Sequence, residues 1–450
     1  MSDLLPSQQE GAEFLSARRG ALLADEPRVG KTKPTIRACD YVLAEDVLWL
    51  TKGGARADHR NAWCETQMID RQVTSIYSGS DRLPDGGTIV TSYDLAVGAL
   101  FEDLRARKFH AVVFDESHRL KNLKAKRTQR AFGENAQRAG GLVERADFAW
   151  ALTGTPYPNN YAEIYPVARA LFPEALRTKR GIMSYPEFER RFCTVRDAGW
   201  GPKIVANRNA AELHERMAPY FLRRKFSEVF PDASVPVTER LFLDAQGNLD
   251  FLKDAEIVEI RKKYEPALRR ARGNTELTDT ILRQIESEVG PKLQRLTGEA
   301  KAAPLAQWAI EQIEDGVGKI VIFAWHRTVL DALAEALRRF NPITIDGRTT
   351  GRQKDVLKHR FQTDPKCKVA LGQIVAAGEA IDLSAADTLV FAEASWSAGD
   401  NDQAWRRIVN MMKRSPVWVL FATLADSIDE DVQRANERKM RDITAVIDGE

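Results

Sequence analysis

Short apolar runs alternate with longer polar stretches over the first third of the chain. The runs are ALLA at 21–24, VLWL at 47–50, VTSIY at 73–77, TIVTSY at 88–93, AVVFD at 111–115 and FAWALTGT at 148–155. Continuous runs rich in Val, Ile and Leu, separated by segments of helical length, are typical of a parallel sheet whose two faces are covered by helices. We therefore predict an α/β lobe with a parallel sheet over this part of the chain.

The pattern changes in the middle of the chain and then returns. Between Asn159 and about Ala300, charged segments of helical period such as Tyr185–Cys193 and Leu249–Arg272 replace the apolar runs, which predicts helical protrusions. From Lys319 the strand rhythm resumes in the runs KIVIFAW, ITIDG, KVALGQ, TLVFAEASW and VWVLFATL. The whole pattern predicts two α/β lobes with parallel sheets and helical insertions between them.

The expected domain boundaries follow from these changes of pattern. Residues 1–238 are expected to form the first lobe, with a helical insertion at about 159–220. Residues 239–300 are expected to form a helical insertion and linker, and residues 301–450 the second lobe. A chain of 450 residues is long enough for such units to have cores of their own.

The stretch ADEPRVGKT at 24–32 follows the first apolar run and opens a segment of helical pattern that extends to about Leu43. A strand that ends in a tight loop before a helix N-terminus presents backbone N–H groups to an anion. We interpret it as a nucleoside-triphosphate loop, with Lys31 at the β- and γ-phosphates and the Thr32 hydroxyl at Mg²⁺. The strict pattern G-x-x-x-x-G-K-[ST] is not met, because Asp25 stands where the first glycine belongs. The loop by itself is therefore a weak signal.

A second stretch that could contribute catalytic residues is AVVFDESH at 111–118, in which an apolar strand ends in two carboxylates. Ligands of open α/β sheets bind at the carboxyl ends of strands, so Asp115 and the loop with Lys31 can share one crevice. Asp115 would then hold Mg²⁺, and Glu116 would orient or deprotonate the attacking water. An isolated Asp-Glu pair would more simply cap the next helix. Its combination with Gly-Lys-Thr favours the ATP site.

The composition is that of an ordinary globular protein and excludes several classes. The chain has 66 basic and 64 acidic residues, a net charge of +2, so a nucleic-acid partner has to be argued from local patches. Four scattered cysteines without a CxxC pair indicate reduced thiols and no zinc site. The polar N-terminus is not a signal peptide, and the longest apolar run, Val417–Ala425, is too short to cross a bilayer. We expect a protein of the cytoplasm, or of the nucleoid or a host-cell interior, that is neither secreted nor membrane-bound.

Nine stretches in order along the chain resemble the motifs of the Swi/Snf-type family of superfamily-two helicases and translocases, whose members have two RecA-like lobes. In the first lobe they are LLPSQQEGAEFL at 4–15, ADEPRVGKT at 24–32, TSYDL at 91–95, DESHRLKN at 115–122, LTGTPYPNN at 152–160 and FLRRKFSEVFP at 221–231. In the second lobe they are KIVIFAWH, IDGRTTGRQKDVLKHRFQ and AAGEAIDLSAADTLVFAEASW. The sequence of the second-lobe motifs is most similar to that of the annealing-helicase branch.

The resemblance implies roles for particular residues. ATP binding is implied for Gln8, Arg28, Gly30, Lys31 and Thr32, with Gln8 reading the adenine and Arg28 standing where the family has glycine. Mg²⁺ is implied to bind Thr32 and Asp115, and the catalytic residues are implied to be Glu116, Asp115, Lys31 and Arg407. Coupling between the motifs is implied for His118, Thr153, Thr155 and Gln403.

Nucleic-acid contacts are implied at the ends of strands and just past the Asp-Glu motif. The matching positions are Thr51, Lys52, Thr91, Ser92, Lys121, Lys124 and Gly378. Such contacts would be made to the phosphate backbone, with little reading of bases. For the lysines, a solvated helix face is the alternative.

The sequence departs from the family in its sixth motif, which usually reads Q-A-x-x-R-x-x-R-x-G-Q. Here Gln403 and Arg407 keep their positions, but Asn410 replaces the second arginine, the residue credited as an arginine finger. Such a finger contributes roughly 10³–10⁵ in rate in related hydrolases. The neighbouring cations that could replace it are Arg406, Lys413 and Arg414.

Two functions are compatible with these motifs. The first is a DNA-dependent ATPase, a monomeric motor that couples ATP hydrolysis to translocation on duplex DNA, with helicase-like remodelling or annealing. The alternative is an ATP-gated DNA-binding or interaction protein with weak or no turnover, because of Asn410. A kinase or GTPase is disfavoured because it leaves the later motifs unexplained.

Overall fold

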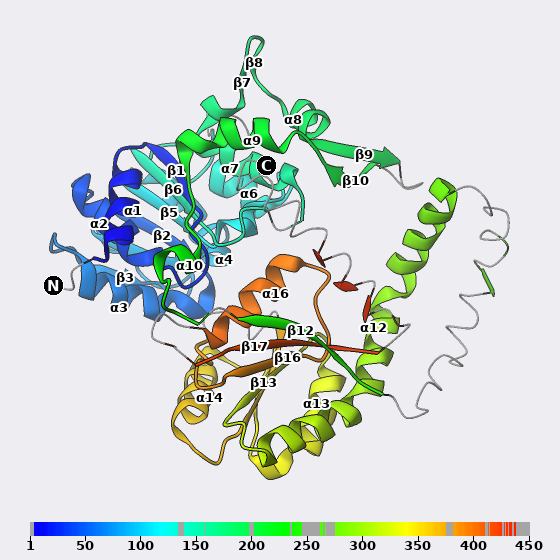
Figure 1. Cartoon of the computed structure of the whole chain (residues 1–450). Coiled ribbons are helices and arrows are strands. Elements are labelled where there is room, and N and C mark those ends of the chain that lie inside the picture. The colour runs from blue at the N-terminus through cyan, green and yellow to red at the C-terminus, as the bar shows by residue number, and fades with distance from the viewer. Residues whose placement is uncertain are drawn as a thin grey trace. The chain divides into compact units, whose positions relative to one another are not determined.

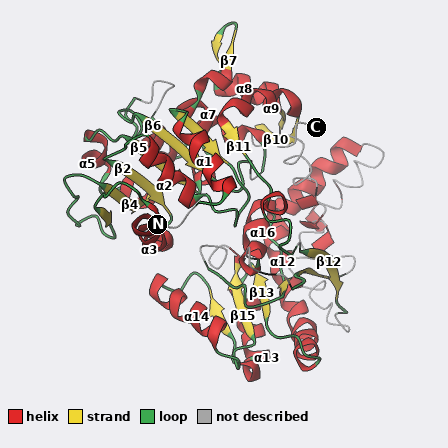
Figure 2. Ribbon diagram, turned by 60° about the vertical axis from the view of Figure 1, so that its left-hand side comes forward, coloured by secondary structure: helices red, strands yellow, loops and turns green. Residues whose placement is uncertain are grey.

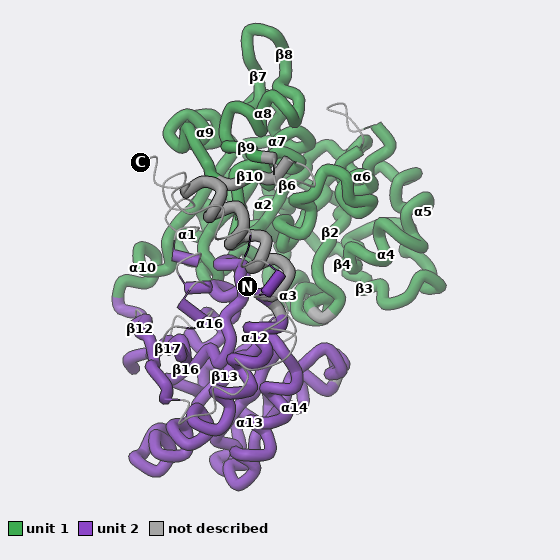
Figure 3. The backbone as a smooth tube through the Cα atoms, turned by 90° about the vertical axis from the view of Figure 1, so that its right-hand side faces the viewer, with its two compact units in different colours: residues 1–231, 439–450 green, residues 232–438 purple. Residues whose placement is uncertain are grey.

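The computed structural model divides into two compact units, one formed by residues 1–231 with 439–450 and one by Asp232–Arg438 (Figure 3). The described residues are 4–133, 139–157, 159–197, 202–234, 236–244, 262–263, 266, 275–374, 381–409, 413, 415–424, 427, 429–430, 432–433 and 436–437. Each unit contains its own parallel sheet and is described here by itself.

The first unit is built on a seven-stranded sheet in the order β11-β1-β6-β5-β2-β4-β3. Its strands are β1 (Gly20–Leu23), β2 (Val47–Thr51), β3 (Val73–Ser75), β4 (Thr88–Ser92), β5 (Ala111–Asp115), β6 (Phe148–Leu152) and β11 (Phe221–Leu222). Every neighbouring pair is parallel. Each apolar run predicted as a strand forms one, which confirms the first α/β lobe.

Helices cover both faces of this sheet (Figure 2). They are α1 (Pro6–Ser16), α2 (Thr32–Tyr41), α3 (Arg56–Thr66), α4 (Tyr93–Ala96), α5 (Phe101–Ala106), α6 (Lys126–Phe132), α7 (Tyr165–Leu171), α8 (Tyr185–Phe192), α9 (Ala210–Met217) and α10 (Phe226–Val229). Alternate strand residues enter two separate cores: Leu48 and Leu50 pack with α4 to α7, whereas Val47 and Trp49 pack with α1 to α3. Burial on both faces explains the continuous apolar runs.

The insertion expected at about 159–220 is not purely helical. Besides α7, α8 and α9 it contains two short antiparallel pairs, β7 (Arg177–Thr178) with β8 (Gly181–Ile182) and β9 (Cys193–Asp197) with β10 (Pro202–Asn207) (Figure 1). The helical prediction was therefore wrong for these segments. The strands β7 and β8 have only two residues each, and β9 and β10 lie among charged residues without a long apolar run, so neither pair gives a clear strand pattern.

The second unit is built on a six-stranded sheet in the order β12-β17-β16-β13-β15-β14, again with parallel neighbours. Its strands are β12 (Val237–Phe242), β13 (Ile320–Ala324), β14 (Ile343–Ile345), β15 (Val369–Gln373), β16 (Thr388–Phe391) and β17 (Trp418–Thr423). Its described helices include α12 (Thr275–Glu314), α13 (Arg327–Ala336), α14 (Gly351–Thr363) and α16 (Ala398–Trp405). The second α/β lobe is confirmed.

The strand β12 corrects the expected boundary at residue 238. Its residues Val237–Phe242 pair with β17 along their full length, so the segment belongs to the second sheet. The sequence VTERLF has no continuous apolar run, because β12 is an exposed edge strand. Its partner lies far along the chain, so only the folded structure could assign it.

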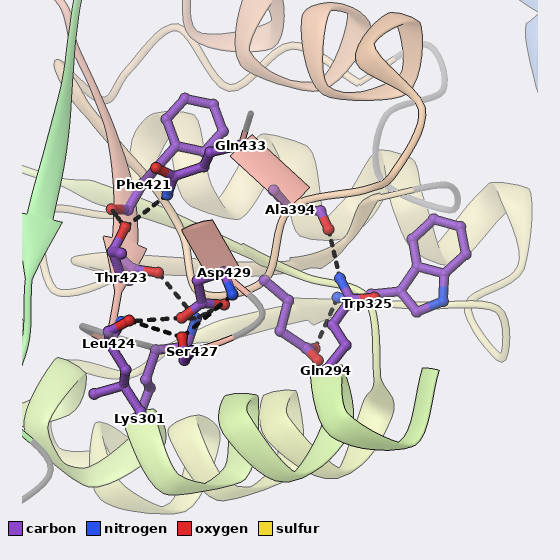
Figure 4. A network of polar contacts seen from close by, with 12 residues as sticks. Gln294, Lys301, Trp325, Ala394, Phe421, Thr423, Leu424, Ser427, Asp429 and Gln433 are labelled. Carbon is purple, nitrogen blue, oxygen red and sulfur yellow. Dashed lines mark hydrogen bonds and ion pairs between the residues drawn. The ribbon is translucent and has the colours of Figure 1, made fainter. Parts of the chain in front are cut away.

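A buried ion pair fixes α12 to the second sheet (Figure 4). The Nζ atom of Lys301 donates to both carboxylate oxygens of Asp429 at 2.8 Å and to the Ala422 carbonyl oxygen at 2.9 Å. Asp429 also accepts from the Leu424 backbone N–H at 3.0 Å. These bonds satisfy a fully buried ammonium group, which would otherwise be strongly destabilising. Although α12 has 40 residues, no described helix is long and apolar enough to span a membrane.

Candidate nucleotide-binding site

The loop after β1 folds around the side chain of Lys31. The Nζ atom donates to the Asp25 carbonyl oxygen at 2.7 Å and to the Glu26 carbonyl oxygen at 3.3 Å. Lys31 is the N-cap of α2, and Thr32 is its first helical residue. The first N–H groups of a helix have no partner within it, so they are available to an anion. The structure thus forms the strand–loop–helix arrangement that the sequence predicted.

Two loop residues have positive φ angles and explain the family's preference for glycine. Gly30 has φ 99° and Arg28 has φ 73°, the left-handed region that favours glycine. Gly30 also lies against α1, since a Cβ atom there would be 2.9 Å from Gln8 Nε2. Gln8 Oε1 accepts from the Leu5 backbone N–H at 3.1 Å, so this side chain connects the start of α1 to the loop.

Arg224 holds the loop through Asp25, an interaction that the sequence did not predict. Its backbone N–H and its Nε each donate to Asp25 Oδ1 at 3.0 Å, and its Nη2 pairs with Oδ2. Its Nη1 also contacts Glu10 of α1 at 3.2 Å. Asp25 is 1% exposed, and Arg224 supplies the partner that a buried carboxylate requires. The position where a strict phosphate loop has glycine is therefore a structural anchor.

Arg223 and the motif with Gly154 support the same loop. Arg223 Nη1 donates to the carbonyl oxygens of Ala24 at 2.8 Å and Gly154 at 3.0 Å. A Cβ atom on Gly154 would lie 2.6 Å from Pro27, which shows how closely the two loops approach. The carboxyl ends of β1 and β6 are thus bound together by a segment that follows β11.

Asp115 is held at the end of β5 by two donors. Thr51 Oγ1 donates to Asp115 Oδ2 at 2.8 Å, as expected from a register that places Leu50 beside Phe114. His59 Nε2 lies 2.9 Å from the same oxygen. Burial by itself raises the pKa of Asp115, but His59 and Thr51 more than offset it, so that the pKa is lowered. Asp115 is therefore a carboxylate at neutral pH.

The charged side chains expected to be catalytic influence one another's pKa values. Burial lowers the pKa of Lys31, and the carboxylates of Glu116, Asp25 and Asp115 oppose this shift. Lys31 in turn helps to lower the pKa of Asp115. A buried ammonium group next to carboxylates at a helix N-terminus can balance the charge of a polyphosphate and its metal.

His118 connects the Asp-Glu motif to the motif at the end of β6. Its Nδ1 lies 3.1 Å from Thr153 Oγ1 and 3.4 Å from Glu116 Oε2. Thr153 Oγ1 also accepts from the Thr155 backbone N–H at 3.1 Å. Burial lowers the pKa of His118 to about 4, against the charge of Glu116, so the ring is neutral at neutral pH. Three of the four residues expected to couple the motifs, His118, Thr153 and Thr155, thus lie in one hydrogen-bonded chain, with Glu116 next to His118. The fourth, Gln403, is on α16 of the second unit.

Most residues expected to contact nucleic acid are buried. Thr51 and Thr91 have no exposed surface, and Ser92 caps α4 by accepting from the Leu95 backbone N–H at 3.3 Å. Lys52 is 9% exposed. For Thr51 in particular, the hydroxyl is engaged with the Asp115 carboxylate and is not part of an outer surface.

The lysines after the Asp-Glu motif differ in their availability. Lys121 pairs with Glu163 at 3.0 Å. Lys124 is exposed, so its ammonium group is accessible at the surface of the first unit. Gly378 lies outside the described residues.

In the second unit, the described cations next to Asn410 have partners within that unit. Lys413 Nζ pairs with Asp387 at 2.8 Å and donates to the Ser384 carbonyl oxygen at 2.9 Å. Arg406 pairs with Asp402 at 3.0 Å and lies over the Trp405 ring. These contacts disfavour Lys413 and Arg406 as replacements for the missing arginine.

The remaining residues of the sixth motif are only partly described. Gln403 is buried in α16, and the backbone carbonyl of Arg407 accepts from the Leu383 N–H at 2.9 Å. Asn410 and Arg414 lie outside the described residues.

The donor set fits Mg²⁺ bound together with nucleotide phosphates. Among the described residues, no group of three or more His, Cys, Asp or Glu side chains could hold a metal by itself. Mg²⁺ usually takes one or two protein oxygens and completes its shell with phosphates and water. Asp115 and Thr32 supply such oxygens, and Lys31 and the N-terminus of α2 supply phosphate donors. The residues present therefore fit Mg·ATP.

Fold and site together define a two-lobed α/β protein of the P-loop nucleotide-binding class. Two family models match the chain, the SNF2-related domain at residues 58–247 and the helicase conserved C-terminal domain at residues 305–411. Together they match about two thirds of the chain. The chain therefore combines an SNF2-related domain with a helicase C-terminal domain, and its two parallel sheets are RecA-like lobes.

Curated relatives match almost the whole chain at low identity. One is the SWI/SNF-related matrix-associated actin-dependent regulator of chromatin subfamily A-like protein 1 of Xenopus tropicalis, 28% identical over 95% of this chain and 43% of its own length. Another is the DNA annealing helicase and endonuclease ZRANB3 of Mus musculus, 26% identical over 99% of this chain and 41% of its own length. The chain thus spans about two fifths of these relatives. The similarity confirms the expected relationship to the annealing-helicase branch.

A solved structure also resembles the chain. It is the Sulfolobus solfataricus SWI2/SNF2 ATPase core in complex with dsDNA, 18% identical, covering 96% of this chain and 90% of that chain. The two structures superpose with a TM-score of 0.44.

Proposed function

We propose that this protein is a DNA-dependent ATPase that couples ATP hydrolysis to translocation on duplex DNA. The observation that carries the proposal is the convergence of Lys31, Asp115 and Glu116 at the carboxyl end of the first sheet, beside the start of α2. This arrangement offers a cation for phosphate, a carboxylate for a metal and a second carboxylate for water. These are the parts that phosphoryl transfer to water requires.

Each residue has a distinct part in the proposed reaction. Lys31 and the first N–H groups of α2 bind the β- and γ-phosphates, and Thr32 and Asp115 hold Mg²⁺. Glu116 orients the attacking water and accepts its proton. Mg²⁺, when bound, neutralises charge on the phosphates.

Other residues are proposed to position the nucleotide and to transmit its state. Gln8 reads the adenine from α1, and Arg28 contributes charge to the loop. His118 transmits the state of Glu116 to Thr153 and Thr155 through the contacts described above. In the sixth motif, Arg407 contributes charge to catalysis and Gln403 contributes to coupling between the motifs.

The proposal of DNA as the partner rests on the family and on the names of its relatives, one of which is called a DNA annealing helicase. The exposed Lys124 after the Asp-Glu motif is compatible with contacts to a phosphate backbone. We propose that the protein acts as a monomer.

The first prediction concerns the ATPase reaction itself. We expect the purified protein to hydrolyse ATP faster with duplex DNA than without nucleic acid. The rate with duplex DNA should also exceed the rates with single-stranded DNA and with RNA. A still higher rate with forked DNA would indicate a preference for annealing or remodelling substrates. The Lys31→Ala variant is expected to lose at least about 100-fold in kcat/KM, because it lacks the charge that binds the phosphates. Turnover equal to that of Lys31→Ala under every condition would reject the ATPase proposal.

The second candidate function is ATP-gated DNA binding without turnover. It is supported by Asn410 in the sixth motif and by the pairing of the neighbouring Lys413 with Asp387. In that case, ATP would change the affinity for duplex DNA while hydrolysis stayed at the level of Lys31→Ala. Measuring DNA affinity with ATP and with a non-hydrolysable analogue in the same preparation separates the two functions.

A further inference from the structure

A histidine from outside the predicted motifs contacts the metal-binding carboxylate. His59 is on α3, which packs on the face of the sheet that carries Trp49. Its Nε2 lies 2.9 Å from Asp115 Oδ2. A carboxylate can only accept hydrogen bonds, so the Nε2–H of His59 is the donor. Neither the phosphate loop nor the Asp-Glu motif accounts for this residue.

The two donors to Asp115 use the same oxygen atom. Thr51 Oγ1 and His59 Nε2 both reach Oδ2, at 2.8 and 2.9 Å. Within the described residues, Oδ1 accepts no hydrogen bond. This arrangement fixes the carboxylate plane while it leaves one oxygen for a metal or for a metal-bound water.

Aromatic packing fixes the orientation of the histidine ring. The ring centroids of Trp49 and His59 are 5.1 Å apart, and Trp63, one helical turn after His59, contacts Trp49 edge-on at 5.9 Å. Trp49 precedes Thr51 by two residues on β2, so both side chains point to the same face of the sheet. The imidazole is therefore held on the side of the sheet from which it reaches Asp115.

The polarity of His59 is not explained by packing. Its Nδ1 is buried, and among the described residues it has no hydrogen-bond partner. An unsatisfied buried nitrogen costs free energy that a leucine of similar size would avoid. The hydrogen bond from Nε2 to Asp115 is the interaction that offsets this cost and accounts for a histidine at this position.

We propose that His59 is a positioning residue that holds Asp115 through Oδ2 and thereby leaves Oδ1 available to a bound Mg²⁺. This inference rests on the proposed function, because it assumes that Asp115 binds the metal of Mg·ATP. Hydrogen-bonded partners of metal ligands typically change metal affinity or activity by roughly 10–100-fold when they are removed. His59 is expected to act at this level without touching the nucleotide.

The test compares nucleotide binding with and without the metal. Fluorescent mant-ATP is titrated into the full chain with Mg²⁺ or with EDTA, and the ratio of the two Kd values measures the contribution of the metal. We expect His59→Leu to reduce this ratio by roughly 10-fold while the Kd in EDTA stays unchanged. His59→Gln, whose amide can donate from the position of Nε2, is expected to restore most of the ratio.

His110→Leu is the matched control. His110 is also on the first unit and accepts from the Asp46 backbone N–H at 3.2 Å, but it precedes β5, at the strand end opposite to Asp115. This variant loses a histidine hydrogen bond and is expected to keep the wild-type ratio. If His59→Leu does not fold, His59→Asn, whose shorter amide cannot reach Asp115, replaces it.

The outcomes separate the inference from the proposed function. A wild-type protein that binds mant-ATP equally with Mg²⁺ and with EDTA would contradict the proposed Mg·ATP site. A wild-type protein with a strong metal effect, together with a folded His59→Leu or His59→Asn variant that keeps the full effect, would overturn the inference about His59 alone. An equal loss in His110→Leu would likewise overturn it, because the effect would then be one of general stability.

Discussion

At the scale of single residues, the site combines unusual backbone angles with shifted protonation. Arg28 and Glu116 have φ angles of 73° and 52°, although neither is glycine. Such conformations cost of order 1–3 kcal/mol and persist where the surrounding structure enforces them. Both residues follow strands of the first sheet, at its carboxyl end. The strained positions thus coincide with the proposed phosphate and water sites.

The protonation of His118 leads to a prediction about stability. Burial lowers the pKa of His118 from 6.5 to about 4, so between these values the unfolded chain binds a proton that the folded protein does not. The free energy of unfolding should therefore fall as the pH falls from about 6.5 to 4, by at most about 1.4 kcal/mol per pH unit from this residue. Urea unfolding at several pH values, compared with His118→Asn, measures it. Parallel pH profiles of the two proteins would contradict the low pKa.

At the scale of elements, the short strand β11 matters more than its two residues suggest. It pairs with β1 at the edge of the first sheet, and the segment that follows it places Arg223 and Arg224 against the phosphate loop. The Glu26 backbone N–H donates back to the Arg224 carbonyl oxygen at 3.1 Å. The loop is therefore held from outside by a segment almost 200 residues away in sequence.

Removal of the Arg224 side chain should weaken both stability and nucleotide binding. Arg224→Ala leaves the buried Asp25 without its partner, which typically costs about 3–5 kcal/mol for a buried ion pair. We expect a lower urea midpoint and a higher KM for ATP. Arg177→Ala is the control, because the pair of Arg177 with Glu174 is 59% and 52% exposed and its loss should leave the urea midpoint nearly unchanged. Similar effects of both variants would show that Asp25 does not anchor the loop.

At the scale of the whole molecule, the two units have similar architectures but contain different motifs. The first unit contains the phosphate loop, the Asp-Glu motif and their supporting arginines. The second contributes the sixth motif, in which Arg406 and Lys413 are engaged with Asp402 and Asp387. For the ATPase proposed above, turnover would depend on whether the sixth motif still supplies a suitable cation.

Restoration of the family's arginine tests this dependence. We expect Asn410→Arg to raise kcat by at least about 10-fold with little change in KM, because an arginine finger stabilises charge in the transition state. Asn410→Gln keeps the side chain neutral and is expected to leave kcat unchanged. DNA-stimulated ATPase assays of the three proteins provide the measurement. A kcat for Asn410→Arg equal to that of the wild type would show that another cation already serves.

The sequence alone determined the two parallel sheets, the phosphate loop and the residues at the ends of β1, β5 and β6. These features could be predicted because strands buried on both faces need continuous apolar runs, and because phosphate chemistry needs Gly-Lys-Thr and carboxylates at fixed places along the chain. The edge strands β11 and β12 could not be predicted, since they are short or exposed and lack such runs.

Only the tertiary structure decided how distant side chains support the site. Asp25 was visible as a departure from the phosphate-loop pattern, but its partner Arg224 was not. His59 and Trp63 are spaced for one helical face, yet nothing local indicates that this face lies against Asp115. A local pattern records which side of an element is buried. The partner across a sheet or loop depends on register and on chain segments far apart, and these are fixed only when the whole unit has folded.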